Sequence, residues 1–156
     1  MVGWVTTLRF ALTSGSVASA TSTAALALLA RAEGKGALQP VNSTSHWRNG
    51  KQAASFRKAD LAHTAVGYAT HHAATVFWAV LFEWWIGTRR PVAALPLMRD
   101  ALAVSAFAAV VDYGATPKRF TPGWEFVLSK RSMAVAYAAM ALGLAAGASI
   151  NRRTPR

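Results

Sequence analysis

Four long apolar stretches alternate with charged or Pro/Gly-rich stretches along this chain. They comprise residues 10–30, 61–87, 92–113 and 133–150. As α-helices they would be about 27 to 40 Å long, and the hydrocarbon core of a bilayer is about 30 Å thick. The pattern predicts a single all-α domain over residues 1–156, an integral membrane four-helix bundle in which each stretch crosses the membrane.

Two of these stretches carry features that allow more than one interpretation. Arg99 and Asp100 lie inside residues 92–113, so the pair sits at an interface, faces the bundle, or marks a helix that starts late. We favour a buried or interfacial pair that faces other protein, because intramembrane charges rarely face lipid. The first stretch resembles a signal peptide at Ala18-Ser19-Ala20, but Arg9 interrupts its apolar region.

Small residues in the first stretch suggest close helix packing. Gly15 and Ser19 are four residues apart and form a small-xxx-small pair, which lets two helix backbones approach closely in a membrane. The alternative is an alanine-rich helix with tolerated serines. We therefore expect either a specific seam or an ordinary packing face here.

The composition supports a membrane protein and excludes several kinds of site. Hydrophobic residues make up 53% of the chain and charged residues 15%. There is no cysteine, which excludes disulfides, thiolate metal sites and cysteine nucleophiles. The net charge of +11 lies between and beside the apolar stretches, a placement that suits lipid phosphates better than nucleic acid. Membrane lipids are thus expected partners, and nucleic acid is not.

The basic residues also predict an orientation. Ten lie in the first and third connections: Arg31, Lys35, Arg48, Lys51, Arg57, Lys58, Lys118, Arg119, Lys130 and Arg131. The opposite side holds Arg9, Arg89, Arg90, Arg152, Arg153 and Arg156, with Arg99 as a possible seventh. Cytoplasmic loops carry an excess of Lys and Arg. We therefore expect both longer connections in the cytoplasm and both termini outside, in a multi-pass membrane protein.

The histidine pair His71-His72 near the middle of residues 61–87 is the main candidate for chemistry. Positions eleven apart share a helix face, so Asp60 and His71 lie on one stripe, and His72 and Glu83 lie on another. The two imidazoles therefore point different ways. We expect His71 to face the bundle, because Gly67 and His63 on its side favour a close neighbour, and we expect His63 to contact Asp60 directly.

Three interpretations of these histidines compete. The favoured one is structural, with hydrogen bonds to serines and threonines of the first helix or to backbone carbonyls. In the second, His71 or His72 binds haem or chlorophyll, with Gly67 giving room to a flat macrocycle. In the third, a proton or ion path passes through titratable groups across the bilayer, namely His63, His71, His72, Glu83, Asp100 and Asp112. Four histidines are too few for a dinuclear oxygenase, and no metal site is predicted.

Aromatic and basic residues near the helix ends predict contacts with lipid headgroups. Trp84 and Trp85 precede Arg89-Arg90, the order expected of an aromatic belt followed by cations. The third connection repeats this pattern, with Phe120 and Trp124 expected to dip into the interface. The headgroup candidates are Arg89, Arg90, Lys118, Arg119 and Trp124, although a plain anchored turn explains the third connection as well.

Asp112 ends the third helix, where a negative charge is unfavourable against the helix dipole unless a cation compensates it. Lys118 or Arg119 is the expected cation. A catalytic Asp112 would need a partner such as His46 from the long first connection. Because no nucleophile elbow, phosphate loop or paired-carboxylate spacing occurs, we predict that the protein is not an enzyme.

One stretch resembles a known family. His63-Thr64-Ala65-Val66-Gly67, then Thr70-His71 and Phe77-Trp78-Ala79, is similar to the second spanning helix of the YagU-like small bacterial inner-membrane proteins. The resemblance covers about one helix in four, and it implies a location in the bacterial inner membrane and an association with acid resistance.

The sequence favours a non-catalytic role. Small-residue faces, short termini and the lack of a soluble domain predict an accessory or structural subunit of a larger membrane complex, with other membrane subunits as partners. The alternatives are a proton, ion or small-solute transport protein, and a haem- or chlorophyll-binding membrane subunit.

Overall fold

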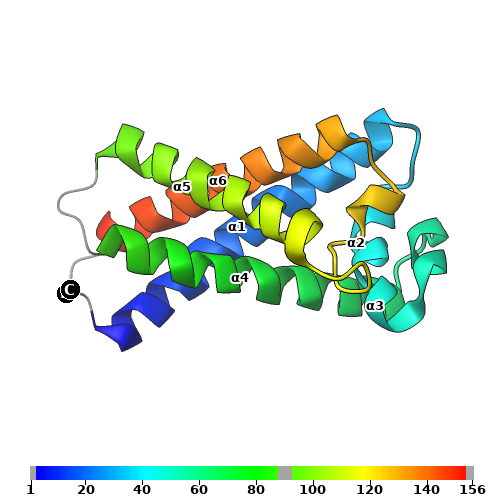
Figure 1. Ribbon diagram of the computed structural model, residues 1–156, viewed down its shortest axis with the longest axis horizontal. Helices are drawn as coiled ribbons and strands as arrows, with labels where there is room; N and C mark the ends of the chain where they lie inside the picture. The colour runs from blue at the N-terminus through cyan, green and yellow to red at the C-terminus, as the bar shows by residue number, and fades with distance from the viewer. Residues whose placement is uncertain (1–2, 88–92, 154–156) are drawn as a thin grey trace.

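Four long helices lie side by side and form the body of the molecule (Figure 1). A computed structural model describes residues 3–87 and 93–153, and these ranges contain helices and turns but no strand. The long helices are α1 (Trp4–Ala32), α4 (Val66–Gly87), α5 (Ala94–Val110) and α6 (Lys130–Arg153). Each overlaps one of the four apolar stretches, so the expected all-helical architecture is confirmed.

Three of these helices are long and apolar enough to cross a membrane. They are Trp4–Ala32, the continuous segment Ala94–Ala115, and Lys130–Arg152. The fourth predicted span, at α4, is long enough but not apolar enough. Two histidines, a glutamate and three tryptophans lower the hydropathy of its 22 residues. The described helices are therefore typical of a membrane protein with three candidate spanning helices.

The chain runs back and forth between two ends of the molecule. Figure 1 shows α1 beginning at the end where α4 and α6 finish and α5 starts. The two long connections lie at the opposite end, as the expected alternation of helices requires. They contain α2 (Gln39–Thr44), α3 (His46–Asn49), η1 (Lys51–Ser55), the π-turns η2 (Leu61–Ala65) and η3 (Val111–Ala115), and η4 (Trp124–Phe126).

Small residues bring the first and last helices into backbone contact. Gly143 and Gly147 of α6 lie directly on α1, and a Cβ on Gly143 would stand 2.8 Å from the backbone nitrogen of Ala18. At Gly147 the added atom would meet the Cα of Ser14. This Gly-xxx-Gly pair is the α1–α6 seam, and sequence analysis missed it although both glycines carry the small-xxx-small signal.

The predicted pair in α1 packs on a different neighbour. A Cβ on Gly15 would lie 2.7 Å from the Cα of Val76, so Gly15 gives α4 its close approach to α1. Ser19 is fully buried in the same helix. The small residues of α1 therefore serve two interfaces, one with α4 and one with α6.

Glu33, the residue that follows α1, caps the start of α6. Its carboxylate accepts hydrogen bonds from the backbone N–H of Ser129 (3.1 Å), from the Ser129 hydroxyl (2.6 Å) and from the Ser132 hydroxyl. A negative charge at this position also suits the positive end of the helix dipole. The end of the first helix and the beginning of the last are thereby joined at the connection end.

The hydrogen bonds of the Glu33 carboxylate predict a stability difference that depends on pH. The hydrogen bonds from Ser129 and then Ser132 hold the pKa of Glu33 below its usual value of 4.5. Because the folded pKa is lowered, the stabilisation is fully present above the unfolded pKa and is lost as the pH falls through the folded one. We expect Glu33→Gln to unfold at a lower temperature than the natural protein at neutral pH, with a difference that shrinks in acid. Thermal unfolding in detergent at about pH 7 and about pH 3 measures this, and a difference that stays constant would contradict the capping role.

Candidate functional site

The first connection folds into a short helix that is buried along its whole length. All six residues of α2 are buried, although most of them are polar. Asn42 shows how this is possible: its amide donates to the carbonyls of Phe56 (2.8 Å) and Lys58 (3.1 Å), and its oxygen accepts from the Thr64 hydroxyl (2.7 Å). Buried polar groups of this kind require partners. The hydrogen bonds hold the connection in one compact arrangement.

Further hydrogen bonds tie α2 to the second long connection. Ser43 donates to the carbonyl of Gly123 (2.5 Å), and the indole N–H of Trp124 donates to the Thr44 hydroxyl (3.2 Å). Gly123 has a φ of +81°, and a Cβ there would lie 2.6 Å from the Ser43 carbonyl oxygen, so this contact requires glycine. We call the assembly of α2, α3, η1 and η4 the cap.

His46 lies inside the cap, between two carbonyl oxygens. Its Nδ1 is 3.0 Å from the oxygen of Ser43, and its Nε2 is 3.1 Å from the oxygen of Lys118. Carbonyl oxygens only accept, so a neutral imidazole donates to one of the two and is in contact with the other. His46 therefore packs between the two connections and is not directed at Asp112, the partner that a catalytic interpretation would need.

His71 of α4 faces the bundle, as predicted. It is only 6% exposed, and its Nε2 lies 3.0 Å from the Ser22 hydroxyl of α1. That hydroxyl is also 2.7 Å from the carbonyl of Ala18, so its single proton goes there and the imidazole donates to Ser22. The histidine therefore bonds to a serine of the first helix, which is the structural interpretation of the sequence.

A cavity of about 300 Å³ lies beside His71. Residues from α4, α6 and both long connections line it, including Thr75, Trp124 and Tyr137, and Asp112 reaches it from the turn after α5. The ring of His71 meets Trp124 edge-on at 5.6 Å between centroids. This cavity is the place where the structure brings predicted titratable residues together.

The space beside Gly67 is occupied by protein. A Cβ on Gly67 would collide with the carbonyl oxygen of Val41 in α2. The glycine thus makes room for the cap rather than for the flat macrocycle considered from the sequence. His72 points away from His71 and is partly exposed, stacked on Tyr68 at 6.0 Å, and its Nδ1 has no hydrogen-bond partner among the described residues.

Asp112 is held by a tyrosine. The hydroxyl of Tyr137 in α6 donates to its carboxylate at 2.6 Å. This corrects the expectation that Lys118 or Arg119 would compensate its charge, and Arg119 instead donates to the carbonyl of Trp47 at 3.2 Å. The neighbouring helix satisfies the carboxylate, so no cation from the same loop is required.

The other candidates for a proton or ion path lie toward one or the other end of the bundle. At the connection end, the carboxylate of Asp60 lies 2.8 Å from Nδ1 of His63, which confirms their direct contact. At the opposite end, Glu83 is buried and lies 3.7 Å from the guanidinium of Arg152. Asp100 is buried and meets the exposed Arg99 at 3.3 Å. His63, Glu83 and Asp100 therefore lie apart from the cavity at His71, and none of them lines it.

The residues predicted to contact lipid headgroups differ in how exposed they are. Trp124 is only 3% exposed, which corrects the prediction that it dips into the interface. Lys118, Arg119 and Phe120 are exposed at the connection end, and Trp84 and Trp85 are exposed near the opposite one. Arg89 and Arg90 lie outside the described residues.

Comparison of the chain with protein-family models, with curated proteins and with solved structures gives no match. The resemblance of residues 63–79 to YagU-like proteins therefore stays a prediction. Within residues 3–87 and 93–153, no group of three or more His, Asp or Glu side chains is placed to hold a metal ion.

Proposed function

We propose that this protein is an accessory or structural subunit of a larger membrane complex, and that the cap is its contact with other subunits. The observation that carries the proposal is that the cap uses its polar side chains on internal hydrogen bonds. The first connection, which is about thirty residues long, therefore has a fixed fold and presents a defined surface. Long connections in compact domains tend to be functional.

The charge of that surface indicates the kind of partner. The exposed cations of the cap and its flanking loops are Arg48, Lys51, Arg57, Lys58, Lys118 and Arg119. The acidic residues of the same region, Asp60 and Glu125, are partly buried. A basic surface on one side of the membrane suits an acidic face of a neighbouring subunit. By the positive-inside rule this side is cytoplasmic, and the resemblance favours a bacterial inner membrane.

Native electrophoresis after gentle extraction tests this function. We expect the natural protein to migrate in a large assembly and Arg48→Glu/Arg57→Glu to migrate mainly as a small species, because like charges oppose docking. Arg9→Glu is the control, since Arg9 is exposed in the first part of α1, which begins at the opposite end (Figure 1). A lone monomer in native membranes would overturn the proposal.

Proton or small-solute handling is a second candidate function, favoured by one observation. His71 and Asp112 are distant in sequence but line the same cavity of about 300 Å³. Ionisable groups that face an internal cavity of a membrane bundle mark transport paths. The remaining alternative, a haem or chlorophyll ligand, would have to bind through Nδ1 of His71 as long as Nε2 is bonded to Ser22.

Flux in liposomes separates this candidate from the first. His71→Gln is expected to abolish a proton or solute flux if the cavity is part of a path, since glutamine fills similar space but does not titrate. His72→Gln serves as the control, because His72 points away from the cavity. Equal flux in the natural protein and both variants would count against transport.

A further inference from the structure

A second, larger cavity separates α5 from α6. Its volume is about 680 Å³, and its walls are mainly apolar residues on one face of each helix. On the α5 side these are Leu102, Ala106 and Ala109, and on the α6 side Met133, Ala134 and Ala138. Four of the six are alanines, and the groove exists because these small side chains face each other where larger ones would fill the space.

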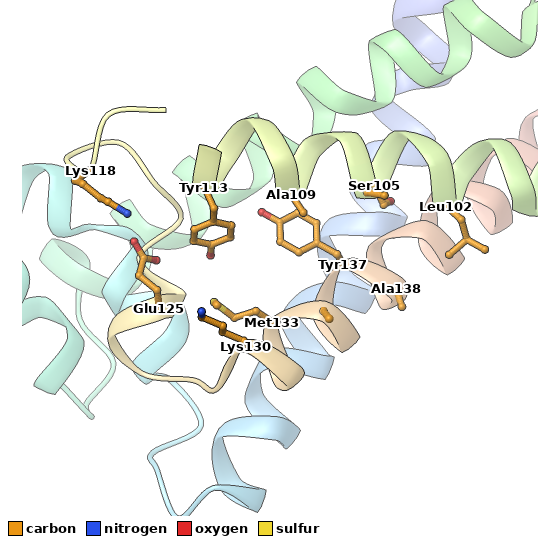
Figure 2. Close-up of a pocket in the computed structure, with 12 residues that line it drawn as sticks. Leu102, Ser105, Ala109, Tyr113, Lys118, Glu125, Lys130, Met133, Tyr137 and Ala138 are labelled. Atoms are coloured by element: carbon orange, nitrogen blue, oxygen red, sulfur yellow. The ribbon is translucent and has the colours of Figure 1, made fainter. Parts of the chain in front are cut away.

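The charged residues of the groove lie at one end only. Figure 2 shows the ammonium groups of Lys118 and Lys130 gathered with the carboxylate of Glu125 at the connection end, while Leu102 and Ala138 lie toward the other end. Tyr113 lies between the charges and the alanines. The lining therefore changes from charged at the connection end to mainly apolar at the other end, where Ser105 lies among the apolar residues. This is the order of an amphiphile from headgroup to tail.

The length of the groove matches one leaflet. Leu102 and Tyr113 are eleven residues apart, a rise of about 16 Å along a helix. The hydrocarbon core of a bilayer is about 30 Å thick, so a leaflet contributes about half of that. A lipid of the leaflet at the connection end would place its headgroup beside Lys118 and Lys130 and an acyl chain along the alanines.

Polar atoms in the walls lack partners. Tyr113 Oη, Glu125 Oε2 and Ser105 Oγ are buried without a hydrogen bond to any described residue, and all three residues line the groove. Ser105 is only 2% exposed. Buried polar groups normally have a partner. Glu125 accepts from Thr121 through its other oxygen (2.5 Å), so Oε2 remains for a donor on a ligand.

We propose that the α5–α6 groove binds one anionic glycerophospholipid with a hydroxylated headgroup, of the phosphatidylglycerol type. Lys118 and Lys130 meet the phosphate, and a headgroup hydroxyl donates to Glu125 Oε2. The hydroxyl of Tyr113 donates to an ester carbonyl, and the alanine face holds an acyl chain. Two lysines and one glutamate give the mouth a net charge of +1, which a headgroup of charge −1 neutralises.

Native mass spectrometry of the full chain with defined lipids tests this site, independently of the proposed function. We expect phosphatidylglycerol to stay bound more tightly than phosphatidylcholine of the same chains, which has no headgroup donor for Glu125. Lys118→Gln/Lys130→Gln should weaken phosphatidylglycerol binding by about tenfold or more. Arg31→Gln/Arg131→Gln removes two exposed cations that do not line the groove and should leave phosphatidylglycerol binding unchanged.

A second pair of variants tests the apolar part. Ala109→Trp fills the groove and should abolish retention of the lipid, whereas Ala103→Trp adds the same bulk to an exposed position of α5 outside it. The proposal would be overturned if the lysine and the arginine double variants lost phosphatidylglycerol binding equally, or if the natural protein bound the two lipids equally. Undiminished lipid binding in Ala109→Trp together with release from a larger assembly would make the groove a protein interface instead.

Discussion

Gly143→Val is expected to separate α1 from α6 and to destabilise the bundle by about 3 kcal/mol. Even a single Cβ at this position would lie 2.8 Å from the backbone nitrogen of Ala18, and backbone atoms cannot move aside as a flexible side chain can. Overpacking of this kind typically costs about 1 to 3 kcal/mol, and sometimes more. Titration with a denaturing detergent in mixed micelles measures the free energy of unfolding.

A matched control lies three residues further along the same helix. Ala146→Val introduces the same β-branched side chain into α6 at an exposed position, so it reports the effect of valine on the helix without the seam. We expect it to change stability by less than about 0.5 kcal/mol. If both variants unfold alike, α1 and α6 do not meet at Gly143.

Asn42→Leu is expected to release the cap from the bundle. Leucine has a similar size, but it leaves the carbonyls of Phe56 and Lys58 and the hydroxyl of Thr64 without the partner they now share. An intramolecular hydrogen bond contributes about 1 kcal/mol to stability, so we expect the loss of these three to cost roughly 3 kcal/mol. The loss acts locally, on the part of the connection that precedes α4.

Limited proteolysis reads out this release. Arg57 and Lys58 are exposed trypsin sites beside the two carbonyls that Asn42 holds, so their cleavage should accelerate in Asn42→Leu. Gln52→Ala removes an exposed amide from the same connection and should leave the rate near that of the natural protein. Equal cleavage rates in all three proteins would show that Asn42 does not secure the cap.

The sequence predicted well what depends on helical periodicity. The eleven-residue spacing places His71 and His72 on different faces, and the structure shows His71 buried against α1 and His72 on the outer side. The contact between Asp60 and His63 also agrees with their three-residue spacing, although Asp60 is the N-cap that precedes η2. Such local relations require no knowledge of the neighbouring helices.

The cap could not be predicted, because its contacts join residues far apart in the chain. The sequence around Trp124 is typical of an interfacial anchor. In the structure Trp124 is buried, and its indole N–H donates to the hydroxyl of Thr44, eighty residues away. Asp112 likewise finds its partner on α6, where Tyr137 reaches it. Only Gly143 and Gly147 gave a local signal that was overlooked, since their four-residue spacing indicates a packing face.

The pairing of α1 with α6 also has a consequence for biogenesis. Thr21 donates to the carbonyl of Ala139 at 3.0 Å, across 118 residues, so α1 has its main neighbour in a helix that is made well after it. Until α6 has been made, the Ser14 and Ala18 face of α1 stays without this partner. Contacts between such distant segments form late. Arrival of α6, rather than insertion of α1, is therefore the step that commits α1 to its final place.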